Sequence, residues 1–213
     1  MSLTILIVLA ALAIGAFLSK SKTRPPAVPL PSTSTGWVIG PIIRGTNHSI
    51  GMPASPTPLG VGWFIDFPGP GGKVDYVQNF SPPALQAGKT LKIDFTVSGA
   101  GFTPYEFPDR QAMVSIQFQR RGDNWSGTGA MQSYRWYSRQ MVLLAPGEFT
   151  LTVPLVLESW GDVQGKSDNP DAFAAAMLDL DNIAIVFGHS SGAGHGVYAS
   201  EPSRFTLLDM AQV

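Results

Sequence analysis

The sequence contains no cysteine among its 213 residues. Disulfide bonds, cysteine-based zinc sites and thiol nucleophiles are therefore excluded as sources of stability or chemistry. The absence leaves the cellular compartment open, because exported proteins need not contain disulfides.

Charged residues are also scarce, and neither sign dominates. Lysine and arginine number 14, aspartate and glutamate number 15, and the net charge at pH 7 is −1. Nucleic-acid binding needs a concentrated positive field, so the composition argues against a nucleic-acid partner. Apolar residues make up 44% of the chain, so the chain as a whole is not of the disordered type.

Charge is absent from residues 3–18, an almost unbroken apolar run that Lys20, Lys22 and Arg24 follow. The run predicts an uncleaved transmembrane helix over residues 1–19, although a comfortable span takes about 20 residues. A cleaved signal segment is the alternative. Residues 20–36 are rich in proline, serine and threonine, which predicts a linker, and the globular domain then occupies residues 37–213.

The flanking charges and the character of the domain point to opposite membrane orientations. Positive residues after the apolar run favour a cytoplasmic domain, whereas a strand-rich domain of this kind is typical of exported proteins. We expect a membrane-anchored protein whose domain is periplasmic or extracellular.

Alternation of apolar and polar residues with period two dominates the domain. It is clearest at residues 91–97 and recurs at 114–119 and 149–155, where Pro154 indicates an edge strand or a bulge. Further strands are expected at residues 37–43, 62–67, 74–78, 134–144, 183–187 and 204–210. The 23 glycines and 18 prolines suit the tight turns that join short strands.

A single segment, residues 170–180, has helical character. Asp168 or Asn169 can cap it, Pro170 suits its first turn, and Phe173 and Met177 share one face. Many short strands with one short helix predict an all-β fold, a two-sheet antiparallel sandwich of jelly-roll type.

Three stretches carry a resemblance to known domains: residues 144–155, residues 160–165, and the pair 183–188 and 204–209. Their pattern resembles the jelly-roll sandwiches of carbohydrate-binding modules and galactose-binding-like domains. With the apolar leader included, the chain is similar to uncharacterised membrane-anchored bacterial proteins. The resemblance implies a β-sandwich that binds a carbohydrate or a cell-envelope glycan, although likeness of fold does not by itself establish function.

The most conspicuous cluster lies between residues 117 and 137, in a predicted hairpin. Flat aromatic rings cover the C–H faces of sugars, and amide, carboxylate and guanidinium groups bond their hydroxyls. We therefore predict a ligand site with Trp125 as the aromatic platform. Arg121, Asp123 and Asn124 would bond hydroxyls, and the remaining candidates are Gln117, Gln119, Tyr134, Trp136 and Tyr137.

Strand alternation limits this set, because Tyr134 and Trp136 must face away from Arg135 and Tyr137. Only one of these pairs can meet the ligand, and the sequence leaves open which. Tryptophan, tyrosine and arginine are also favoured at protein interfaces. A structural or protein-interaction module with a protein partner on the same surface is therefore the alternative.

No catalytic constellation stands out, so a non-enzymatic role is expected. Residues 188–192 match the G-x-S-x-G pattern of hydrolases, with Ser190 as nucleophile, but a glycine-rich segment follows where that motif needs a helix. An esterase or glycosidase is therefore disfavoured, and no catalytic residue or metal ligand is assigned. No cofactor is required; a structural calcium ion is left open, bound by the loop carboxylates of Asp162, Asp168, Asp171 and Asp181.

Overall fold

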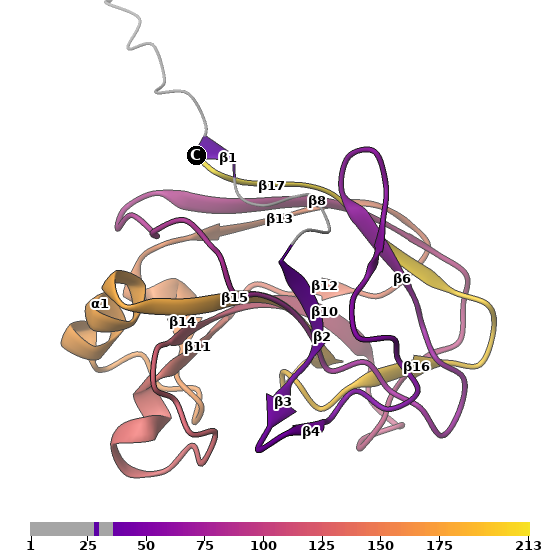
Figure 1. Ribbon diagram of the computed structural model, residues 1–213, viewed down its shortest axis with the longest axis horizontal. Helices are drawn as coiled ribbons and strands as arrows, with labels where there is room; N and C mark the ends of the chain where they lie inside the picture. The colour runs from indigo at the N-terminus through magenta and orange to yellow at the C-terminus, as the bar shows by residue number, and fades with distance from the viewer. Residues whose placement is uncertain (1–27, 30–35) are drawn as a thin grey trace, which may run out of the picture.

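The computed structural model describes residues 28–29 and 36–213, which form two main antiparallel sheets around a shared core (Figure 1). The first sheet has the strand order β13 (Gly147–Pro154), β8 (Thr90–Ser98), β17 (Arg204–Gln212), β6 (Trp63–Asp66) and β5 (Thr57–Pro58), and β1 (Val28–Pro29) pairs with β17. The second has the order β14 (Trp160–Gly161), β11 (Arg135–Ser138), β10 (Ala112–Arg120), β15 (Leu180–His189), β7 (Tyr76–Asn79) and β2 (Trp37–Gly40), with β12 (Val142–Leu143) also beside β10.

Two short strand pairs lie outside the two main sheets. The first joins β9 (Phe102–Pro104) to β16 (Val197–Ala199), and the second joins β3 (Ile42–Ile43) to β4 (Thr46–Asn47). Short 3-10 turns run over η1 (Gly129–Ser133) and η2 (Leu157–Ser159). This architecture is the antiparallel β-sandwich with one helix that the sequence predicts.

Aromatic side chains join the two sheets through the core. Phe205 on β17 stacks on Phe95 of the same sheet and meets Phe187 of the second sheet edge-on, with ring centroids 5.3 Å apart. Trp37 and Trp63 form a second link between the sheets at 5.1 Å. Burying such large apolar surfaces is the main favourable term in the folding of this domain.

The helix α1 (Pro170–Leu178) begins and ends close to the expected limits. The side chain of Asn169 caps it by accepting the backbone N–H of Ala172 at 3.1 Å. Phe173 of α1 is buried against Trp136 and Phe118, whose ring centroids lie 5.1 and 5.6 Å from its own. The helix therefore covers the core at the end of β10 and β11.

Most expected strands are present, and the differences have local causes. Pro154 lies on β13, which is an edge strand as predicted. The strand expected over residues 134–144 is divided into β11 and β12, because Ser138 interrupts the ladder. Its hydroxyl accepts the backbone N–H of Ile116 and donates to the carbonyl of Gln140.

The second sheet is buried on both faces, unlike the first. Side chains of β8 alternate between buried and half-exposed, whereas nearly all residues of β10 and β15 are buried. The face of β10 that points away from the core carries Ser115, Gln117 and Gln119. A polar sheet face that is nevertheless buried must be covered, and residues 121–134 supply part of that cover.

The expected transmembrane helix of residues 1–19 lies outside the described residues, as does most of the linker of residues 20–36. Within the described part of the chain, no helix is long and apolar enough to cross a membrane.

Candidate ligand-binding cleft

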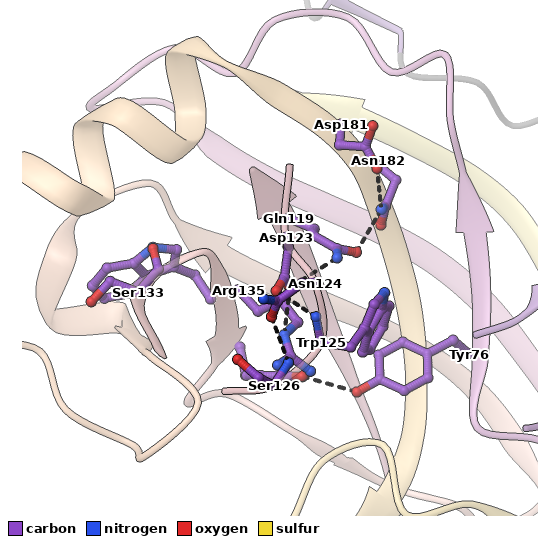
Figure 2. Close-up of polar contacts among 12 residues, drawn as sticks. Tyr76, Gln119, Asp123, Asn124, Trp125, Ser126, Ser133, Arg135, Asp181 and Asn182 are labelled. Atoms are coloured by element: carbon purple, nitrogen blue, oxygen red, sulfur yellow. Dashed lines mark hydrogen bonds and ion pairs between the residues drawn. The ribbon is translucent and has the colours of Figure 1, made fainter. Parts of the chain in front are cut away.

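The loop of residues 121–134 folds back over the outer face of the second sheet and is anchored by Asp123 (Figure 2). Arg135 Nε lies 2.7 Å from Asp123 Oδ2. Gln119 Nε2 donates to the same oxygen at 2.9 Å, and the backbone N–H of Trp125 donates to Asp123 Oδ1 at 2.9 Å. The last contact is the local turn that an aspartate makes with the residue two positions later. One fully buried carboxylate thus fixes the loop to both strands of its hairpin.

Trp125 is placed over the sheet by this anchor. Its backbone φ is 65°, in the left-handed region that side chains other than glycine rarely adopt. The Arg135 guanidinium lies 4.5 Å from the indole ring, and Tyr76 meets the ring edge-on at 5.6 Å (Figure 2). Trp125 also packs against the patch that Tyr76 forms with Ala184 and Val186. The indole is half-buried and keeps one part of its surface open.

A cleft of about 680 Å³ opens beside Trp125. This volume lies within the ordinary range of small-molecule sites. Its floor comes from the second sheet, and loops from distant parts of the sequence form its walls. Its lining includes Pro41, Ile43, His48, Lys73, Asp75, Tyr76, Glu106, Trp125, Arg135, Tyr137, Arg139, Met141, Asp162, Gln164 and residues 190–195.

Two tyrosines on the floor share a hydrogen bond. The hydroxyls of Tyr76 and Tyr137 lie 3.0 Å apart, and either can be the donor. Burial raises the pKa of both phenols above the ordinary tyrosine value. Both hydroxyls therefore stay protonated at neutral pH, and one of the two protons is not used in their mutual hydrogen bond.

Asp75 and Lys73 form a buried ion pair beside the tyrosines, with Lys73 Nζ 2.9 Å from Asp75 Oδ2. Desolvation by burial raises the pKa of Asp75 to about 7, against the opposing effect of Lys73. Asp75 Oδ1 has no hydrogen-bond partner among the described residues. A cleft carboxyl that titrates near neutrality is a common feature of functional sites, although structural ion pairs show it too.

The glycine-rich loop of residues 190–195 forms one wall. His195 Nδ1 lies 2.9 Å from a carboxylate oxygen of Glu106. Ser190, at the nucleophile position of the G-x-S-x-G pattern, is exposed, and it is Ser191 whose Oγ lies 3.4 Å from His189 Nδ1. Burial, followed by the charge of Arg110, lowers the pKa of His189. The imidazole therefore serves to hold the turn, since its Nδ1 accepts the backbone N–H of Ser191.

The structure brings together only part of the cluster expected between residues 117 and 137. Trp125 and Tyr137 line the cleft. Asp123 anchors the loop behind them, where its side chain has no exposed surface. Gln117 and Gln119 lie on the same sheet face but are buried beneath the cover, with 0% and 3% of their surface exposed.

The other candidates lie elsewhere. The inclusion of Trp136 in the ligand face is corrected, because its side chain is fully buried in the core against Phe173. Arg121 pairs with Asp179 at 3.5 Å, away from the cleft lining. Tyr134 lies under the Arg120 guanidinium in a separate hollow. The side chain of Asn124 is exposed and accepts the backbone N–H of Ser126.

Sequence reasoning missed the residues that come from other strands. Lys73, Asp75 and Tyr76 lie about fifty residues before Trp125 and reach the cleft only because β7 pairs with β15. The available signal was the pattern of residues 73–76, where two charged residues flank a valine at the start of a strand. Charged residues on either side of a valine are common at the start of a strand, so this pattern did not indicate a binding site.

The four carboxylates considered for calcium do not converge. Among the described residues, no group of three or more acidic or histidine side chains could hold a metal ion. Asp162 Oδ1 instead accepts the backbone N–H groups of Gln164 and Lys166, and its Oδ2 accepts from the Gln132 amide. This carboxylate shapes its own turn.

No family model matches the chain, and the curated proteins include no match. Among solved structures, it is similar to Xylanase10C from Cellvibrio japonicus, in complex with xylopentaose, with a TM-score of 0.40 and 12% identity. The similarity covers 86% of this chain and spans 28% of the length of that xylanase. A second structure, from work on endo-acting O-glycanases that members of the human gut microbiota express to initiate mucin breakdown, has a TM-score of 0.40 and 10% identity. It covers 92% of this chain and 95% of that one.

Proposed function

We propose that the domain binds a glycan, without cleaving it, in the cleft beside Trp125. The observation that carries this proposal is the combination of surfaces in one cleft of about 680 Å³. Trp125 and Tyr137 offer aromatic surface to C–H groups, while Arg135 and the tyrosine hydroxyls offer hydrogen bonds to hydroxyls. Sugars need both kinds of contact at once.

The cleft carboxylates support a role in binding more than one in catalysis. Glycoside hydrolysis requires two carboxyl groups that face the scissile bond. Glu106 is engaged by His195, Asp162 by backbone N–H groups, and Asp75 by Lys73.

The proposal includes the jelly-roll assignment and a membrane tether with the domain on the periplasmic or extracellular side. The tether is inferred from the apolar run of residues 3–18.

The test is a broad glycan array followed by calorimetry with the glycans that bind. Trp125→Ala is expected to weaken binding at least tenfold, while circular dichroism shows an intact fold. Phe80→Ala is the matched control, since Phe80 is an exposed aromatic residue outside the cleft lining and should leave binding unchanged. Failure of the wild-type domain to bind any glycan would contradict the proposal.

Glycoside hydrolysis is a second candidate, and the state of Asp75 is the observation that favours it. A carboxyl with a pKa of about 7 could act as a general acid at neutral pH. Release of reducing ends from a bound glycan, lost in Asp75→Asn while binding persists, would support this candidate over pure binding. Binding without release would dismiss it.

The protein-interaction alternative loses part of its basis in the structure. The aromatic and arginine residues do not form one surface, because Trp136 is buried and Arg121 pairs with Asp179. Light scattering on the domain tests this alternative, for which a stable self-assembly is expected.

A further inference from the structure

The loop that joins β5 to β6 exposes apolar side chains at its tip. Leu59 and Val61 are 43% and 68% exposed, and both lie in the turn in which the backbone N–H of Leu59 donates to the carbonyl of Gly62 at 3.1 Å. Leu208 of β17, itself 40% exposed, lies beside this turn, because its Cα is 3.4 Å from the position of a Cβ on Gly62. Single exposed apolar residues are ordinary, whereas three that adjoin form a patch that a partner can cover.

The loop is also free of charge. Residues 51–65 contain no aspartate, glutamate, lysine or arginine, and the three prolines among them carry no backbone N–H. Charged groups and unpaired backbone groups are what an apolar medium penalises most, so this tip can leave water at low cost. Asp209, which follows Leu208, is exposed, and its charge confines any such transfer to the tip.

The strand register places this patch close to β1. β6 pairs with residues 204–207 of β17, and β1 pairs with Ala211 and Gln212. Because β8 occupies the other edge of β17 along its whole length, β6 and β1 share one edge. Leu207, beside the base of the loop, and Ala211, beside β1, are separated along β17 by about 13 Å.

The occupant of the patch follows from the sequence before β1. Residues 3–18 are the apolar run that the proposed tether places in a bilayer, and residues 19–27 separate this run from Val28. A chain of that length spans at most about 35 Å when fully extended. The bilayer surface is therefore within reach of the sheet edge that carries the patch. Lys20, Lys22 and Arg24 fall in the interval, and basic side chains are attracted to anionic headgroups.

Contact at this patch decides which way the cleft points. The loop and β1 belong to the first sheet and lie at the upper side of Figure 1, whereas β3, whose Ile43 lines the cleft, lies at the lower side. The floor of the cleft is the outer face of the second sheet, across the core from the first. A bilayer against the loop therefore leaves the cleft open on the opposite side of the sandwich.

We propose that the β5–β6 loop is a lipid-contact site, in which Leu59, Val61 and Leu208 enter the interfacial layer of the bilayer that holds the tether. The inference rests on the proposed tether and adds an orientation to it, in which the cleft faces away from that membrane. The glycan that the cleft binds is then one displayed beyond the membrane surface, rather than the headgroup of a lipid within it.

The test uses the full chain with a fluorophore at one position, which is simple because the chain has no cysteine of its own. Val61→Cys, labelled with nitrobenzoxadiazole, is reconstituted into phosphatidylcholine vesicles with plain or brominated acyl chains. The emission is expected to shift to the blue on reconstitution and to lose intensity with brominated lipid, because bromine quenches at short range. The same label on Ser190→Cys, at an exposed residue of the cleft wall, should show neither change.

A charged replacement separates insertion from proximity. Leu59→Glu should abolish the bromine quenching of the label at position 61, because a carboxylate resists transfer into the acyl region. Leu178→Glu is the matched control, since Leu178 is 85% exposed at the end of α1, which packs on the second sheet. This control should leave the quenching unchanged. Circular dichroism of both variants checks that the fold persists.

Each other outcome overturns the inference in a different way. Flotation of the chain with vesicles, without quenching at position 61, overturns the lipid contact but leaves the tether intact. Failure of the chain to float overturns the tether and the contact together, and glycan binding keeps its own test. Equal quenching at positions 61 and 190 overturns the orientation. A blue shift without quenching means that protein covers the patch, either a second copy or the apolar run of the same chain.

Discussion

Arg135 and Asp123 form an ion pair at 2.7 Å with 7% and 0% of their side chains exposed, at the point where the covering loop meets the sheet. The same guanidinium supports the indole of Trp125 at 4.5 Å. One arginine therefore joins the fold of the hairpin to the geometry of the cleft. Loss of this pair should affect stability and ligand binding together.

Removal of the Asp123 carboxylate should destabilise the domain strongly. Asp123→Ala leaves the Arg135 charge buried without its partner, so the free energy of unfolding should fall by about 3–5 kcal/mol in urea titrations. Arg204→Ala is the control, because it breaks an exposed pair with Asp66 and should cost about 1 kcal/mol or less. Similar losses in the two variants would contradict the buried character of the first pair.

Stability should decrease as pH rises toward neutrality because of Asp75. The pKa of Asp75 is about 7 in the folded state, above the ordinary value of 3.8 that applies to the unfolded chain. Between these two pH values the folded state therefore binds one proton that the unfolded state does not. Protonation of Asp75 in the folded state therefore adds up to about 4 kcal/mol to the free energy of unfolding. This stabilisation is complete below about pH 4 and is lost as the pH rises through 7. The difference in urea midpoint between wild type and Asp75→Asn across pH 4–8 measures it, and a constant difference would contradict it.

Gly194 should tolerate no side chain. A Cβ atom there would lie 2.0 Å from the Tyr76 hydroxyl, at a backbone φ of +77°. Gly194→Ala is therefore expected to lower the free energy of unfolding by about 2–4 kcal/mol and to displace Tyr76 from Tyr137.

Gly129→Ala is the matched control for the close approach at Gly194. Gly129 also has a positive φ, of +57°, but nothing lies within 4 Å of its Cβ position. Only the backbone strain remains, so the expected cost is about 1 kcal/mol. Equal costs at the two glycines, measured by thermal or urea unfolding, would show that crowding against Tyr76 is unimportant.

Replacement of the two tryptophans of the hairpin by alanine should lower the free energy of unfolding by different amounts. Trp136→Ala removes a fully buried side chain and should cost about 3–5 kcal/mol in unfolding free energy. Trp125→Ala removes a half-buried ring and one cation–π contact, and should cost about 1–2 kcal/mol. Chemical denaturation of both variants checks this order, and a reversed order would place Trp125 in the core.

Sequence patterns predicted correctly the features that depend on residues close together in the chain. Alternation over residues 91–97 matches β8, whose side chains alternate between buried and half-exposed. Asn169 and Pro170 mark the start of α1 because capping depends on neighbours within one helical turn. The same alternation showed that Trp136 and Tyr137 must face opposite sides of β11, without showing which side is the core.

The site depended on contacts between residues that lie far apart in the chain. Tyr76 and Tyr137 are separated by sixty-one positions, and their bond exists only because β7, β15, β10 and β11 lie side by side. Arg121 looked like a ligand residue next to Asp123, but Asp179 at the end of α1 engages it. Strand order in a sheet is a non-local property, so neither outcome could be read from residue spacing.

By itself, the sequence determined a cysteine-free, β-rich domain with a net charge near zero and one capped helix, and it identified the hairpin that carries Trp125. These features follow from composition and from the period of side-chain orientation, which are local. Only the tertiary structure decided that Trp136 belongs to the core, that Asp75 and Tyr76 join Trp125 in one cleft, and that Gln117 is buried beneath the covering loop. The reason is physical: burial and hydrogen-bond partners depend on which strands become neighbours.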